Sequence, residues 1–139
     1  MITAPASIVS MLVVEDNNDD VLLLREALDT EMPGHFQLTQ VGQLHEALKC
    51  LCQRTFDVIM LDLNLPDSFG SNTFAHIRTT AERTPIIIYS GDVEKGLRVM
   101  ASLKGGEEFV YKGTFNGPAL TRAILKALSG GSPGNFSME

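Results

Sequence analysis

Short apolar runs alternate along this chain with segments whose apolar residues recur at helical spacing. The runs at 8–14, 58–61 and 86–89 are almost continuously apolar, which is typical of strands buried on both faces. A partly alternating segment at 36–41 predicts a strand near a sheet edge, and 109–111 predicts a fifth strand. Strict alternation of strands and helices predicts a parallel sheet with helices on both faces, which is a doubly wound α/β fold.

Polar residues stand where four of the predicted strands end. Glu15 and Asp16 follow the first strand, Asp62 the third, Ser90 the fourth and Lys112 the fifth. The carboxyl ends of parallel strands lie on one edge of the sheet, and ligands bind at this edge in open α/β sheets. The five side chains are therefore predicted to converge on one site.

Carboxylates brought together in this way need a cation between them. Two carboxylates about 4 Å apart repel by about 4 kcal/mol at an effective dielectric constant near 20. A divalent ion with oxygen ligands fits such a cluster best, and Mg²⁺ is the usual choice where the carboxylates also meet a phosphate. Lys112 would add a second positive charge from the opposite side.

The segment after Asp62 reads LNLPDSFG and predicts a sharp turn. Pro66 fixes one backbone φ angle, and Gly70 permits an unusual one. Asp62 is therefore predicted to lie in an open mouth rather than in the core, and the next helix is predicted to begin at Thr73.

These motifs together resemble the receiver domain of two-component response regulators, in its single-domain, chemotaxis-regulator-like form. The resemblance covers residues 8–128 and rests on the acidic pair, on Asp62 within DLNLPDSFG, on Ser90 and on Lys112. One such motif alone is weak evidence for a family, whereas five motifs in order on the expected elements are specific evidence. The resemblance implies a flavodoxin-like (βα)5 fold with strand order 2-1-3-4-5. Residues 1–7 would be an N-terminal extension, and residues 129–139, rich in Gly and Ser, a disordered tail.

The resemblance also implies a role for each site residue. Asp62 would be the phosphoacceptor, assisted by Lys112 and Ser90. Mg²⁺ would be held by Asp16, Asp62 and the backbone carbonyl of Asn64, with Glu15 contributing through a water molecule. Ser90 and Phe109 would form the switch that follows phosphorylation.

The implied function is that of a phosphoacceptor in signal transduction. Asp62 would take a phosphoryl group from a sensor histidine kinase or a histidine phosphotransfer protein, and the chain would catalyse only its own phosphorylation and dephosphorylation. The signal would pass to an unknown downstream protein through the face formed by the fourth helix, the fifth strand and the fifth helix. The alternative is a pseudo-receiver, an interaction module that works without phosphorylation.

Two positions depart from the family pattern. Gly113 stands after the lysine, where the family often has proline, and Glu15 stands where aspartate is commoner.

Composition excludes several other classes of partner and compartment. A net charge of −6 argues against a nucleic-acid surface, and no apolar run is long enough to span a bilayer. Cys50 and Cys52 lie two positions apart on a predicted helix, so they face different ways and are predicted to be reduced. These features predict a cytoplasmic protein with no membrane contact.

Three other families share parts of these motifs. GGEEF at 105–109 matches the diguanylate cyclase signature, but only 30 residues follow it, and a glycine pair before a strand explains the letters. Aspartate-nucleophile phosphatases need a second acid where Asn64 stands. A flavin site is disfavoured because acids follow the first strand in place of a phosphate-binding loop.

Overall fold

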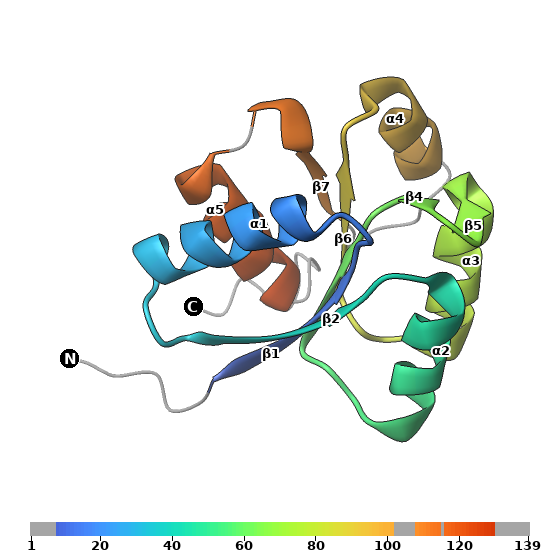
Figure 1. The fold of residues 1–139 in the computed structure, drawn as a ribbon, viewed down its shortest axis with the longest axis horizontal. Helices are drawn as coiled ribbons and strands as arrows, with labels where there is room; N and C mark the ends of the chain where they lie inside the picture. Colours follow the sequence, from blue (N-terminus) through green and yellow to red (C-terminus); the bar gives the residue numbers. More distant parts are fainter. Residues whose placement is uncertain (1–7, 102–107, 115, 130–139) are drawn as a thin grey trace.

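The computed structural model describes residues 8–101, 108–114 and 116–129. Its centre is a five-stranded parallel sheet in the order β2–β1–β3–β6–β7 (Figure 1). The strands are β1 (Val9–Val14), β2 (Phe36–Val41), β3 (Val58–Leu61), β6 (Ile86–Ser90) and β7 (Glu108–Tyr111). Counted along the chain, these five strands follow the order 2-1-3-4-5. The predicted doubly wound fold and its strand order are therefore confirmed.

Helices cover both faces of the sheet (Figure 1). The helices α1 (Asn18–Glu31) and α5 (Gly117–Leu128) lie on one face, and α2 (Leu44–Gln53), α3 (Gly70–Thr80) and α4 (Val93–Ala101) lie on the other. Successive residues of a strand point to opposite faces, so Met11 and Val13 join the core under α1 and α5, while Leu12 and Val14 join the core under α2 and α3. This double burial is why β1 reads as a continuous apolar run.

The two helices on the first face begin with side-chain caps. Asn17 accepts a hydrogen bond from the backbone N–H of Asp20 at 3.0 Å, and Asn116 accepts one from Ala119 at 2.9 Å. Pro118 stands in the first turn of α5, where its missing N–H costs nothing. Each cap satisfies a backbone N–H group of the first turn that has no partner within its helix.

The segment after Asp62 differs from the prediction. It forms a small hairpin of β4 (Asn64–Leu65) and β5 (Ser68–Phe69), and α3 begins at Gly70, three residues before the predicted start. Gly70 has a φ of +67°, so the expected unusual backbone angle is present there. A short 3₁₀ helix, η1 (Lys112–Thr114), also follows β7.

Some predictions fall outside the described residues. These are the extension at 1–7, the first three letters of the GGEEF motif at 105–107, and the tail from 130 onward. Among the helices that the structure does describe, none combines the length and the apolar character that crossing a membrane requires.

Asp67, at the tip of the β4–β5 hairpin, connects this hairpin to α2. Its carboxylate accepts hydrogen bonds from the backbone N–H groups of Leu44 at 2.8 Å and His45 at 3.1 Å. Gln43, the residue before α2, makes no side-chain cap of its own. Asp67 therefore caps α2 from a distant segment, and these N–H groups hold the pKa of its carboxyl below the usual range.

Asp67→Ala is expected to lower the free energy of unfolding by about 1 kcal/mol, the usual contribution of a helix cap. Because the pKa of Asp67 is lowered, its stabilisation is present at neutral pH and disappears as the pH falls through the folded-state pKa. Urea denaturation at neutral and acidic pH measures both effects. Asp67→Asn keeps one oxygen acceptor and should lose less, and an Asp67→Ala protein as stable as the parent would refute the cap.

Candidate functional site

Three carboxylates meet at the carboxyl ends of β1 and β3. Val14 of β1 pairs with Leu61 of β3. Glu15 and Asp62, which directly follow these two residues, therefore lie side by side. Oxygen atoms of Glu15, Asp16 and Asp62 lie within 4.8 Å of one another. Asp16 is exposed, whereas Glu15 and Asp62 are 1% and 5% exposed. The expected convergence is present, but Asp62 is more enclosed than the predicted open mouth, because its neighbours cover it.

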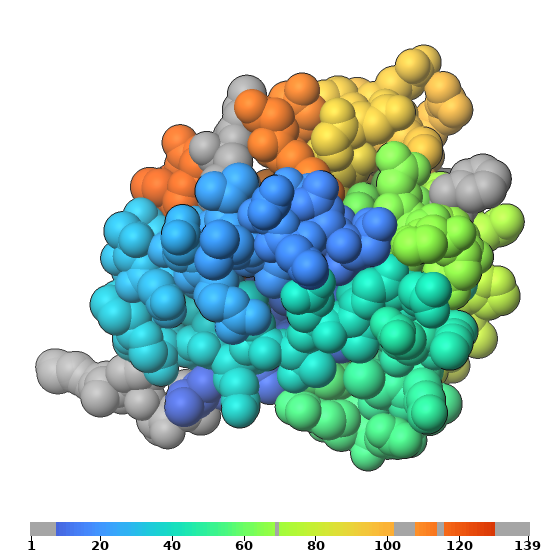
Figure 2. Space-filling view, viewed as in Figure 1, coloured from blue at the N-terminus to red at the C-terminus, as the bar shows by residue number. Residues whose placement is uncertain are grey.

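Lys112 reaches this cluster from the end of β7. It is the first residue of η1, and its Nζ contacts Glu15, lies 2.9 Å from Asp20 and lies 3.4 Å from Asp62. The Nζ also lies 4.9 Å from the centre of the Tyr89 ring, a distance at which an ammonium group is attracted by an aromatic face. In the space-filling view the start of α1, in blue, lies against the orange segment that carries Lys112 (Figure 2).

The electrostatics of the site follow from its burial. Burial raises the pKa of Glu15 to about 7; the contact with Lys112 opposes this rise, and the neighbouring Asp62 adds to it. Burial alone would lower the pKa of Lys112, but hydrogen bonds to Asp20 and Glu15 raise it above its usual value. The ammonium group therefore stays charged, while the carboxylates repel one another.

The donor set fits a hard divalent cation. All the charged donors are carboxylate oxygens, which Mg²⁺ prefers, and the exposed Asp16 leaves a side on which water ligands can complete the coordination. The cluster brings three carboxyl groups together with one ammonium group, that of Lys112, so negative charge is left over. Such a cluster has a physical reason to bind a divalent ion.

Asn64 and Ser90 lie at the same edge of the sheet. The backbone N–H of Asn64 donates to Asp62 Oδ1 at 3.1 Å, and the Asn64 side chain accepts a hydrogen bond from Lys95 on α4 at 2.6 Å. Ser90 is buried, and its Oγ accepts a hydrogen bond from the backbone N–H of Asp92 at 3.0 Å. The Ser90 hydroxyl is thus bonded within its own loop and not to Asp62.

Phe109 lies on β7, where it pairs with Ile88. Its half-buried side chain packs against the core on the α2, α3 and α4 side. A Cβ atom at Gly96 of α4 would lie 2.2 Å from the Phe109 ring, so the absence of a side chain at Gly96 allows the ring to pack against α4.

Sequence patterns did not identify two residues that contact this site. Asp20 lies in the first turn of α1, where an acid is favourable, and this is its signal in the sequence. Lys95 gave no comparable signal, because its contact with Asn64 depends on how α4 packs beside the β4–β5 hairpin.

Comparisons with known proteins point to one family. Residues 11–125 match the model of the response regulator receiver domain. The chain is 28% identical over 128 residues to the response regulator protein FleR of Pseudomonas aeruginosa, an alignment that covers 90% of this chain and 26% of FleR. The chain spans about half or less of the length of the curated relatives that it matches.

Solved structures share the fold. The phosphorylated cyanobacterial phytochrome response regulator RcpA has a TM-score of 0.67 and 26% identity, covering 85% of this chain and 89% of that one. The receiver domain of the sensor histidine kinase PA1611 of Pseudomonas aeruginosa, described with a magnesium ion in its active-site cleft, has a TM-score of 0.73 and 21% identity, covering 88% and 98%. With the family model matching most of its length, the chain belongs to the response regulator receiver domains of two-component signalling.

Proposed function

We propose that this chain is a phosphoacceptor, in which Asp62 takes a phosphoryl group from a phosphohistidine. Receiver domains generally act as signalling modules that partner with histidine kinases or phosphotransfer proteins, rather than as enzymes on other substrates. The observation that carries the proposal is the position of Asp62 within the acidic cluster, 3.4 Å from the ammonium nitrogen of Lys112. This kinase partner is also the reason to expect a cytoplasmic location.

The reaction requires a nucleophile and compensation of charge. An Asp62 carboxylate oxygen would attack phosphorus, the bond from phosphorus to the histidine nitrogen would break, and the imidazole would leave with the electron pair. Lys112 would neutralise charge on the transferring group, which is most of what a protein contributes to phosphoryl transfer. Hydrolysis of the acyl phosphate would restore Asp62.

The ion-binding residues follow from the same cluster. Asp16, Asp62 and the backbone carbonyl of Asn64 would bind Mg²⁺ directly, and Glu15 would bind through a water molecule. When bound, Mg²⁺ would supply positive charge beside the phosphoryl oxygens. The match between the carboxylate set and the preference of Mg²⁺ for oxygen supports this assignment.

Incubation with acetyl phosphate, a small phosphodonor, tests the proposal. The intact mass is expected to increase by one phosphoryl group when Mg²⁺ is present, and to stay unchanged when a chelator removes the ion. An unmodified mass with Mg²⁺ present, for acetyl phosphate and for a phosphorylated histidine donor alike, would favour the alternative of a phosphorylation-independent pseudo-receiver.

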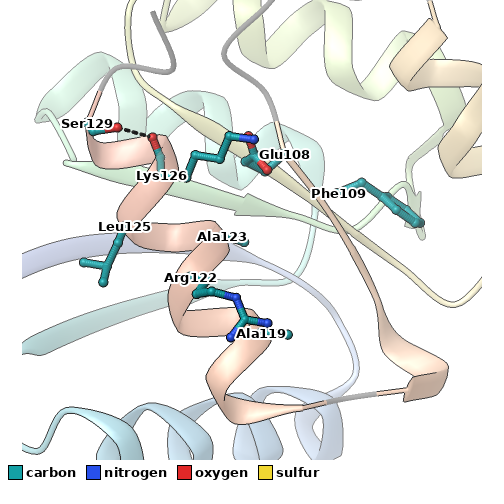
Figure 3. Close-up of a pocket in the computed structure, with 8 residues that line it drawn as sticks. All are labelled: Glu108, Phe109, Ala119, Arg122, Ala123, Leu125, Lys126 and Ser129. Carbon is teal, nitrogen blue, oxygen red and sulfur yellow. Dashed lines mark hydrogen bonds and ion pairs between the residues drawn. The ribbon is translucent and has the colours of Figure 1, made fainter. Parts of the chain in front are cut away.

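The signal would pass to a downstream protein through the face formed by α4, β7 and α5. A groove of about 590 Å³ lies between β7 and α5, and Figure 3 shows Arg122 and Lys126 of α5 among its lining residues, with Glu108 and Phe109 from β7. Leu97 of α4 and Leu125 of α5 are about half exposed, at 56% and 47%. Exposed apolar side chains with polar and charged residues around them are typical of protein-binding faces.

Ser90→Ala is expected to keep phosphorylation at Asp62 but to uncouple it from this face. The phosphoryl oxygens would draw the Ser90 hydroxyl away from Asp92, and a hydrogen bond to a charged group contributes about 1.5–3 kcal/mol. That energy shifts a two-state ratio by about 10- to 150-fold. The coupling is measured by the change in amide chemical shifts near Phe109 on phosphorylation. A change as large in Ser90→Ala as in the parent would refute the coupling.

A further inference from the structure

Lys112 has as many carboxylate partners as it has N–H donors. An ammonium group carries three donors, and its Nζ meets Glu15, Asp20 and Asp62. Glu15 and Asp62 follow sheet strands, whereas Asp20 belongs to the first turn of α1. The side chains of Lys112 and Asp20 are 17% and 28% exposed, so their contact is partly shielded from water.

Asp20 differs from the other two partners in one respect. Glu15 and Asp62 both belong to the carboxylate group that could hold a metal ion, together with Asp16, and Asp20 does not. A cation bound to that group would compete with Lys112 for Glu15 and Asp62. Asp20 is then the carboxylate that still holds the ammonium group in the loaded site.

The backbone at Lys112, the first residue of η1, fixes only the position at which the side chain begins. Gly113 follows it, and a Cβ atom at Gly113 would lie 2.3 Å from the Tyr111 ring, so the packing of Tyr111 leaves no space for a side chain there. A lysine side chain has a flexible stem of four methylene groups, and it loses considerable conformational entropy when it is held in one position. Contacts at its far end must therefore orient it, and Asp20 and the Tyr89 ring provide such contacts.

We propose that Asp20 is a positioning residue, which holds the Lys112 ammonium group beside Asp62 when the acidic cluster is occupied by a cation. This role rests on the proposed function, because it prepares Lys112 to meet the incoming phosphoryl group. Asp20 itself touches neither the phosphoryl group nor the ion. It acts through Lys112.

Two measurements on Asp20→Asn test the proposal, both at saturating Mg²⁺. The rate of phosphorylation by acetyl phosphate is expected to fall about tenfold, the lower end of what one hydrogen bond to a charged group contributes. In the unphosphorylated protein, the ammonium resonance of Lys112, assigned by its loss in Lys112→Arg, should be visible in the parent and broadened by exchange with water in Asp20→Asn. Asp20→Glu, which retains the carboxylate, should recover the rate to within about threefold.

Asp19→Asn is the matched control. Asp19 lies in the same first turn of α1, is exposed, and has the same charge as Asp20. It should keep both the ammonium resonance and the parent rate. A resonance that persists in Asp20→Asn, an unchanged rate, or an equal loss in Asp19→Asn would each overturn the proposal. If the parent takes up no phosphoryl group, the proposed function fails, and the ammonium resonance still decides whether Asp20 holds Lys112.

Discussion

Asp62→Asn is expected to abolish the phosphoryl adduct completely. The amide group of asparagine is a poor nucleophile, and no other carboxylate in the cluster has the position of Asp62, at the end of the central strand β3 and 3.4 Å from Lys112 Nζ. Intact mass after incubation with acetyl phosphate and Mg²⁺ measures the loss.

Asp57→Asn is the control for this experiment. Asp57 precedes the opposite end of β3, where its carboxylate accepts a hydrogen bond from the backbone N–H of Ser10 at 2.8 Å. The same chemical change is thus made next to the same strand but away from the site, and the adduct should remain. An adduct that persists in Asp62→Asn would show that another residue is the acceptor.

The position of the acidic cluster could be predicted because it depends on the strands alone. Apolar runs identify β1 and β3. The parallel order of the sheet then brings Glu15 and Asp62 to one edge, independently of the conformation of the loops. Lys112 follows the same rule at the end of β7. The fold and the candidate site therefore follow from one pattern, that of buried strands that end in polar residues.

Contacts made by long side chains between distant segments could not be predicted in this way. Asp67 caps α2 across 23 positions, and Lys95 meets Asn64 across 31. The β4–β5 hairpin has strands of two residues each, too short for any periodicity to show. Asp20 was recognisable as a favourable acid at a helix start, but its contact with Lys112 requires knowing where η1 places that lysine.

Without a bound cation, the protein is expected to lose stability as the pH rises from about 4.5 to about 7. Burial raises the pKa of Glu15 from its usual 4.5 to about 7, so the folded protein binds a proton that the unfolded chain releases in this range. The stabilising contribution is complete below about 4.5 and disappears as the pH rises through 7. This difference in pKa between the folded and unfolded states corresponds to about 3 kcal/mol in the free energy of unfolding.

Glu15→Gln isolates this effect, because it keeps the shape of the side chain and cannot titrate. Urea denaturation in the presence of a chelator should show the parent losing about 3 kcal/mol relative to Glu15→Gln across that pH range. Mg²⁺ should reverse the trend, since ion binding favours the ionised carboxylate and stabilises the folded protein most at the higher pH. A parent-to-variant difference that does not change with pH would show that folding does not raise the pKa of Glu15, so that Glu15 is ionised at neutral pH. The cluster would then carry its full negative charge even without an ion.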